Sequence, residues 1–140
     1  MASEIERIIE TYSAAVLARD IDAFLALYAD DVVVYDAWDQ WAYRGKREWS
    51  AAVGAWLSSD VSSELHAGFD EVMISGHGSV AAASGRVCYR AVGRHGSELR
   101  SIENRITWLL RRTADGWRIH HEHTSVPVDF QTKSARLTYR

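Results

Sequence analysis

The second half of the chain contains four long segments of β-type residues, and each is separated from the next by a tight-turn signal. Gly76-His77-Gly78, Gly96 and Asp115-Gly116 supply these signals, because glycines and Asp-Gly pairs are typical of the turns that reverse antiparallel strands. The pattern predicts an antiparallel meander whose apolar face requires a covering layer. The predicted strands are residues 65–75, 79–93, 99–112 and 117–126.

The first half of the chain supplies this layer. Apolar residues recur at helical spacing over residues 4–19 and again over residues 46–59. Asp20 is placed to cap a short second helix with Phe24, Leu27 and Tyr28 on one face. A short strand is predicted at 32–35, and residues 37–45 are expected to be irregular. The order indicates an α+β fold in a single domain, 1–140, in which three N-terminal helices pack on a strongly curved, mostly antiparallel sheet and form a cone-shaped barrel.

Composition excludes several classes of protein. A formal net charge of −3 gives no basic face for nucleic acid, and no apolar run approaches the length needed to span a bilayer. The N-terminus lacks the apolar segment of a secretory signal. Cys88 is the single cysteine, so an internal disulfide framework is excluded and a reducing compartment is favoured. We therefore expect a cytoplasmic protein that binds neither nucleic acid nor membranes.

The last predicted strand carries an unusual set of side chains. With strict alternation, one face carries an aromatic, an aliphatic, two imidazoles and a hydroxyl, namely Trp117, Ile119, His121, His123 and Ser125. Such a face suits the wall of a pocket that is apolar at one end and polar at the other. Two histidines in this arrangement can also bind one metal ion, with Asp36 or His66 as a third ligand. Nothing in the spacing marks that third ligand, so no metal site is predicted.

Aromatic residues are concentrated in the middle of the chain. Four of the six tryptophans lie between positions 38 and 56. Large aromatic side chains in this number are consistent with a packed core and a dimer surface, or with an aromatic-lined ligand cavity. The second interpretation makes Trp38, Trp41, Trp56 and Tyr28 candidate residues for binding a small apolar ligand.

Two motifs resemble those of a known superfamily. Tyr12 is followed by Arg19-Asp-Ile-Asp-Ala-Phe24 and by the run from Leu27 to Asp36, Leu-Tyr-Ala-Asp-Asp-Val-Val-Val-Tyr-Asp. Residues 105–112, 115–117 and 119–125 form the second motif. Together they resemble the nuclear transport factor 2-like superfamily, in its SnoaL-like and ketosteroid isomerase-like branch. The second motif is also similar to the association domain of calcium/calmodulin-dependent kinase.

The resemblance implies specific roles. Tyr12 matches the oxyanion-hole tyrosine of the ketosteroid isomerases, and Asp36 matches their proton-shuttling carboxylate. Those isomerases carry a second acid on the penultimate strand, held protonated as a hydrogen-bond donor. Residues 101–110 of this chain contain no Asp, and Ala37 stands where the isomerases have a proline after the base. From the residues alone, Asp36 can also be a strand-end turn cap, and Tyr12 a core tyrosine.

The predicted third strand of the meander presents two possible inner faces. Its even-numbered positions, Ile102, Ile106, Trp108 and Leu110, are the more apolar, so periodicity alone would bury them. The resemblance favours the odd-numbered face, which would direct Arg105 and Thr107 into the cavity. His121 and His123 would then oppose Asp36, and the even-numbered face would form a homodimer interface.

These observations predict a cofactor-free acid–base enzyme of the isomerase, dehydratase or cyclase type that acts on a small apolar organic molecule. Asp36, Tyr12, His121 and His123 are its predicted catalytic residues. Predicted substrate-binding residues are Arg105, Thr107, Trp38, Trp41, Tyr28 and Trp56. The alternative is a non-catalytic module of the same fold that binds a ligand or assembles dimers, as the missing second acid suggests.

Overall fold

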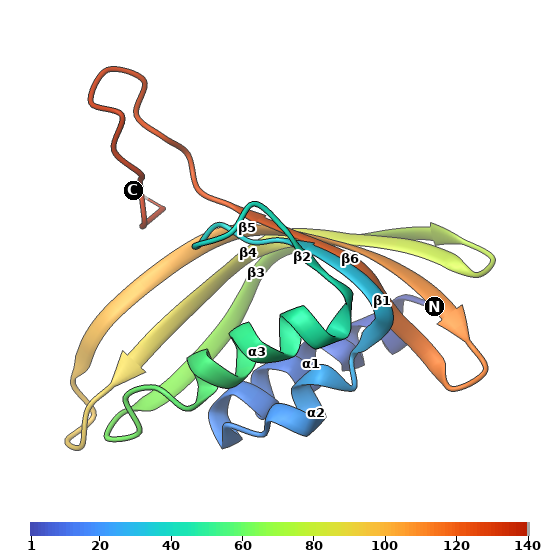
Figure 1. Cartoon of the computed structure of the whole chain (residues 1–140), viewed down its shortest axis with the longest axis horizontal. Helices are drawn as coiled ribbons and strands as arrows, with labels where there is room; N and C mark the ends of the chain where they lie inside the picture. Colours follow the sequence, from blue (N-terminus) through green and yellow to red (C-terminus); the bar gives the residue numbers. More distant parts are fainter. Residues whose placement is uncertain (140) are drawn as a thin grey trace.

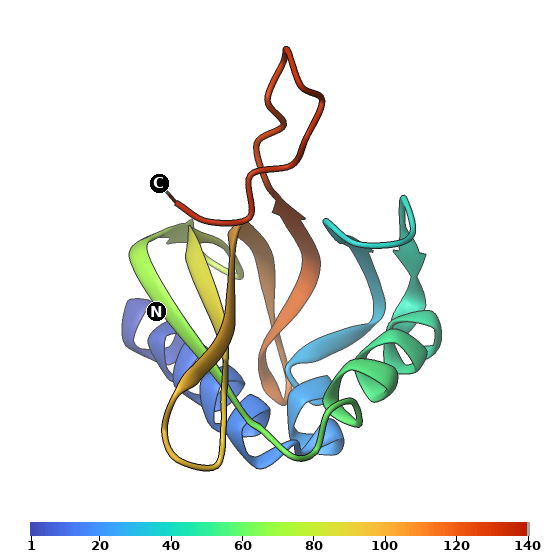
Figure 2. The ribbon, with the colours of Figure 1, turned by 90° about the vertical axis from the view of Figure 1, so that its left-hand side faces the viewer.

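Three helices lie under the concave face of a six-stranded sheet (Figures 1 and 2). The computed structural model describes residues 1–139. The helices are α1 (Ala2–Ala18), α2 (Ile21–Leu25) and α3 (Gly45–Leu57). The strands are β1 (Tyr28–Tyr35), β2 (Tyr43–Arg44), β3 (Glu64–His77), β4 (Val80–Val92), β5 (Glu98–Thr113) and β6 (Gly116–Ser125). Within the described chain, no helix has the length and apolarity required to cross a membrane.

The sheet confirms the predicted α+β architecture. Its strand order is β2-β1-β6-β5-β4-β3, in which only the β1–β6 pair is parallel and the other pairs are antiparallel. The long strands arch over the helices, with α1 packed against β3 and α3 against β1 (Figure 2). Past β6, the chain extends away from the sheet before its end returns towards β5, where Glu103 N–H donates to the Leu137 carbonyl.

The boundary between α2 and β1 differs from the prediction. Asp20 caps α2 as expected, since the Ala23 N–H donates to its side chain at 3.0 Å. The helix ends at Leu25, however, and Tyr28 begins β1 opposite Ile119 of β6. Parallel pairing with β6 provides backbone hydrogen-bond partners here and overrides the helical spacing. The short strand β2, within a segment expected to be irregular, pairs with the end of β1.

A β-bulge in β6 determines which of its side chains face the helices. Leu110 of β5 pairs with Ile119, but the preceding Leu109 pairs with His121, so His120 is an extra residue on β6. One inserted residue shifts the alternation by one position, because side chains in a strand point to opposite faces in turn. Glu122, two positions after the insertion, is consequently buried on the inner face.

The bulge contradicts the interpretation of residues 117–125 as one continuous inner face. Trp117 and Ile119 point inward as predicted, and both are buried. Beyond the bulge, His121 and His123 face outward, on the convex side of the sheet, where the rings of both pack against Tyr35. The predicted alignment of two imidazoles with the inner apolar wall is therefore wrong.

The inner face of β5 is also the opposite of the one that the resemblance favoured. Ile106, Trp108 and Leu110 are buried beneath the helices, whereas Arg105 and Thr107 are exposed on the convex side. The apolar side chains pack against the aromatic cluster of the helices, where the Trp108 ring lies 5.8 Å from that of Tyr12. Hydrophobic periodicity predicted this face correctly, because burial of large apolar area sets strand orientation.

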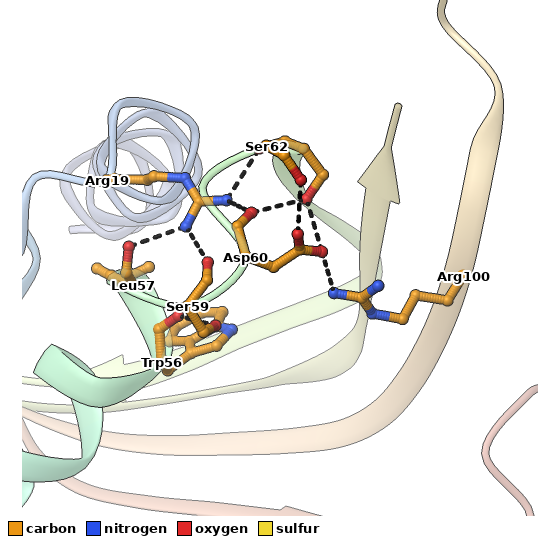
Figure 3. Close-up of polar contacts among 8 residues, drawn as sticks. Arg19, Trp56, Leu57, Ser59, Asp60, Ser62 and Arg100 are labelled. Atoms are coloured by element: carbon orange, nitrogen blue, oxygen red, sulfur yellow. Dashed lines mark hydrogen bonds and ion pairs between the residues drawn. The ribbon is translucent and has the colours of Figure 1, made fainter. Parts of the chain in front are cut away.

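One arginine ties the end of α1 to the connection between α3 and β3 (Figure 3). Arg19 adopts the left-handed conformation that ends α1, with φ of 53°. Its guanidinium donates to four backbone carbonyls of that connection, those of Leu57, Ser59, Asp60 and Ser63, at 2.7–2.9 Å. The Asp60 carboxylate in turn accepts from Arg100 of β5 at 2.8 Å. This network fixes the connection between α3 and β3 to the end of α1 and to β5.

Replacing Arg19 tests the contribution of these contacts. Arg19→Ala leaves the four carbonyls without their charged donor, and we expect the free energy of unfolding to fall by about 2 kcal/mol. Thermal unfolding and urea titration measure the change. Arg7→Ala, an exposed arginine on the same helix, is the matched control and should have little effect. Equal stability of the Arg19 variant and wild type would show that the network does not stabilise the fold.

Candidate functional site

A cavity of about 560 Å³ lies between α3 and the inner face of the sheet. This volume falls within the usual range for small-molecule sites. Aromatic side chains form much of the wall, and the polar side chains are few. Trp49 and Trp56 come from α3, Trp38 from the segment after β1, and Tyr12 from α1. The concave sheet face and the helix layer thus enclose a site that is mainly apolar with a small number of polar groups.

Asp36 reaches the cavity because it continues the alternation of β1. Val34 points into the core and Tyr35 points outward, so Asp36 points inward again. Thr124 Oγ1 donates to Asp36 Oδ1 at 2.7 Å and accepts from the Ala37 N–H at 2.8 Å. Burial raises the pKa of Asp36, although the Thr124 hydrogen bond opposes the shift. The predicted carboxylate therefore lies at the cavity wall in a partly dehydrated position.

Tyr12 forms a pair with Tyr89 of β4. Their hydroxyl oxygens are 2.6 Å apart, and both side chains line the cavity. Burial raises the pKa of both phenols, so both keep their protons at neutral pH. One hydroxyl hydrogen is used between the two oxygens, which leaves the other hydrogen to donate elsewhere. The pair is suited to donate a hydrogen bond, and unsuited to act as a base.

Glu122 is the acidic residue that sequence reasoning missed. Its side chain lines the cavity and is 2% exposed, and its Oε1 accepts from the Tyr28 hydroxyl at 2.6 Å and from Trp108 Nε1 at 2.9 Å. Burial, reinforced by repulsion from Asp36, raises the pKa of Glu122 to about 7 against the two hydrogen bonds. No pattern in the sequence marks the bulge that turns Glu122 inward, so strict alternation placed it on the wrong face.

Glu122 also bears on the departure from the ketosteroid isomerase pattern. The sequence provides no aspartate on the penultimate strand, and Asn104 stands on the inner face of β5 at the cavity wall. The structure supplies a second cavity carboxyl from the neighbouring strand instead. The cavity therefore contains both a half-buried carboxyl at Asp36 and a fully buried one at Glu122.

The predicted aromatic residues divide into three groups. Trp38 and Trp56 line the cavity as expected. Tyr28 is fully buried behind Glu122 as its hydrogen-bond donor and does not line the cavity. Trp41 is 97% exposed, so its predicted place in the cavity is wrong. It lies in the connection between β1 and β2.

Four other predicted residues lie outside the cavity. His121, His123, Arg105 and Thr107 are on the convex face of the sheet. The predictions that Arg105 and Thr107 point into the cavity and that the two histidines oppose Asp36 there are therefore wrong. On the convex face, His121 Nδ1 lies 2.7 Å from the Val33 carbonyl, and Arg105 Nε donates to Ser125 at 3.0 Å. A metal site joining the two histidines to Asp36 is excluded by the same geometry, because the sheet separates them.

The raised pKa of Glu122 predicts a pH-dependent stability. Between the ordinary value of 4.5 and the native value of about 7, the folded chain keeps a proton that the unfolded chain has lost. This contribution to stability is therefore complete below pH 4.5 and is lost as the pH rises through 7. Glu122→Gln cannot titrate, and its amide oxygen still accepts from Tyr28 and Trp108.

Urea titrations between pH 5 and pH 8 measure this effect. We expect the unfolding free energy of Glu122→Gln to rise relative to wild type by about 2.5 kcal/mol across that range. Glu10→Gln, an exposed acid on α1, controls for the loss of a negative charge. A pH-independent difference between Glu122→Gln and wild type would contradict the assigned titration.

Comparisons with known proteins agree with this architecture. The sequence model of the SnoaL-like domain matches residues 5–129. No curated protein matches the chain. An NTF2-like protein of unknown function from Pseudomonas putida KT2440 is 28% identical, with a TM-score of 0.85 over 99% of this chain and 94% of that one.

More distant structures share the fold. An NTF2-like protein with a cystatin-like fold from Novosphingobium aromaticivorans is 17% identical, with a TM-score of 0.75 over 94% of this chain and 85% of that one. A putative calcium/calmodulin-dependent protein kinase II association domain from Xanthomonas campestris is 16% identical, with a TM-score of 0.75 over 89% and 86%. The chain thus belongs to the SnoaL-like family of the nuclear transport factor 2-like superfamily.

Proposed function

We propose that the cavity is the active site of a cofactor-free acid–base enzyme that acts on a small, largely apolar organic molecule. Membership of the SnoaL-like family supports ligand binding or cofactor-free catalysis in general. The observation that carries the finer proposal is the presence of a half-buried carboxyl group, Asp36, and a buried one, Glu122, at one aromatic cavity. Groups with shifted pKa values in a cleft are candidates for proton transfer.

In this proposal, Asp36 removes a proton from a carbon atom of the substrate and returns it at another position. Its raised pKa makes it a stronger base than an exposed aspartate, and the Thr124 hydrogen bond fixes its orientation. Glu122 carries a proton below about pH 7 and donates a hydrogen bond or a proton to a substrate oxygen. The free hydroxyl hydrogen of the Tyr12–Tyr89 pair stabilises negative charge that develops on the same oxygen.

A non-catalytic binding protein is the second candidate function. The hydrogen bond from Thr124 to Asp36 Oδ1 favours it, because this contact reduces the basicity that burial provides. Both candidates are consistent with a cytoplasmic homodimer, which we also propose. The convex face would form its interface, since it exposes Tyr35, Met73 and Leu109 at 38%, 70% and 44%.

Exchange of substrate hydrogen for deuterium tests the catalytic proposal without knowledge of the natural product. We would incubate the protein with a panel of cyclic ketones in D₂O and follow the hydrogens beside the carbonyl by NMR. Asp36→Asn should reduce the exchange rate at least about 100-fold, because a general base typically contributes that much. Glu122→Gln should shift the pH dependence of exchange, since it removes the group that titrates near pH 7.

Binding measurements and an outer-face variant complete the design. Asp36→Asn should bind the same ketones with little change in affinity, measured by calorimetry. His123→Gln, on the convex face, is the matched control and should exchange at the wild-type rate. Binding without exchange in the wild type would favour the non-catalytic module, and undiminished exchange in Asp36→Asn would exclude Asp36 as the base.

A further inference from the structure

The cavity carries charges of opposite sign at its two ends. Asp36 and Asp39 line it beside the connection from β1 to β2, which precedes α3. Arg100 lines the other end, where its guanidinium contacts Asp60 in the connection that follows α3. Figure 2 shows these two connections at opposite ends of α3. A ligand in the cavity therefore meets carboxyl groups at one end and a guanidinium group at the other.

The wall between these two ends is mainly apolar. Trp49 and Trp56 of α3 both line the cavity and are about 10 Å apart along the helix axis. Leu65 of β3 and Ile102 of β5 line it from the sheet. Such a wall fits an elongated molecule that has an apolar body and carries its polar groups at its ends.

Arg100 faces the cavity because it continues the inner face of β5. It pairs with Ala91 of β4, as Ile102 pairs with Tyr89, and all four residues line the cavity. The irregularity in this pair of strands lies beyond Ala91, between Ala91 and Val92. The alternation that buries the apolar side chains of β5 is therefore unbroken as far as Arg100.

The Arg100 guanidinium is oriented by the protein but is mostly unused. Its Nη2 donates to Asp60 Oδ2 at 2.8 Å (Figure 3). Asp60 is itself fixed, because Ser62 Oγ donates to its carboxylate and Arg19 donates to its carbonyl, both at 2.9 Å. Among residues 1–139, no other side-chain hydrogen bond or ion pair engages Arg100. The other guanidinium N–H groups are free, and two of them can bind both oxygens of one carboxylate.

Charge selects a carboxylate for this end of the cavity and sets the direction of the ligand. The Arg100 side chain is 55% exposed, so its ion pair with Asp60 contributes little to stability by itself. Arg90 also lines the cavity beside Arg100 and adds a second positive charge. An anionic group is repelled from Asp36 and attracted to the arginines, whereas the charge of Asp60 disfavours a doubly charged group such as a phosphate.

We propose that Arg100 is a specificity-determining residue that binds the carboxylate of an elongated, otherwise apolar organic acid. This inference rests on the cavity of the proposed function and names the class of its substrate. With the carboxylate at Arg100, the far end of the molecule lies beside Asp36 and Glu122. The carbon atom that loses a proton should therefore be at the end of the substrate opposite its carboxylate.

A series of biphenyl compounds tests the proposal by binding alone. We would measure by calorimetry the affinity of wild type for biphenyl-4-carboxylate, biphenyl-4-carboxamide and biphenyl-4-yl phosphate. The carboxylate should bind about tenfold more tightly than the carboxamide, because only the carboxylate forms charge-assisted hydrogen bonds with the guanidinium. In Arg100→Gln this preference should disappear, while the affinity for the carboxamide stays the same. Arg111→Gln, which removes an exposed arginine from the outer face of the same strand, is the matched control and should keep the preference.

A second measurement uses wild type alone. The side-chain Nε–H resonance of Arg100 in ¹⁵N-labelled protein should shift on addition of biphenyl-4-carboxylate and much less on addition of the carboxamide. The proposal would fail if wild type bound these two compounds equally, if Arg100→Gln kept the preference, or if neither compound bound. Tighter binding of the phosphate than of the carboxylate would overturn the assigned class of ligand.

The outcomes separate this inference from the catalytic proposal. Deuterium exchange into neutral ketones without a preference for the carboxylate would remove this inference and leave the catalytic proposal. A carboxylate preference that depends on Arg100, without exchange in any ketone, would remove only the catalytic proposal.

Discussion

The single extra residue in β6 controls the chemistry of the cavity. Because Leu110 pairs with Ile119 and Leu109 with His121, the strand changes phase at His120. Before the bulge, the inner face of β6 is apolar and carries Trp117 and Ile119. Beyond the bulge, the inner face is polar and carries Glu122 and Thr124. Without the bulge, the alternation would direct histidine side chains into the interior and place Glu122 on the convex face.

The burial of Glu122 links this backbone feature to the core. A buried carboxyl group is costly unless hydrogen bonds satisfy it, and Tyr28 and Trp108 provide two donors to one of its oxygens. Both donors are themselves within the aromatic cluster that joins the helices to the sheet. The packing that stabilises the fold thus also fixes the position of an acid at the cavity. Thr124 has the same relation to Asp36, so both carboxyl groups are oriented by neighbouring side chains.

The sequence predicted most of the architecture and part of the site. Helical spacing and turn signals located the three helices and the four long strands, because these patterns reflect local backbone geometry and one-sided burial. Asp36, Tyr12, Trp38 and Trp56 were placed correctly at the cavity. Residues around the bulge were not, since alternation is reliable only where the ladder has no inserted residue. On β5, apolar periodicity was a better guide to the inner face than the resemblance was.

The sequence by itself determined the α+β class, the order of the helices and the longer strands, and the presence of a carboxylate at the end of β1. Each of these depends on residues close together in the chain, whose spacing carries the signal. Only the tertiary structure decided that Glu122 faces the cavity and that Tyr12 pairs with Tyr89. These facts depend on strand register and on contacts between distant segments, and a one-residue change in register reverses the direction of every side chain beyond it.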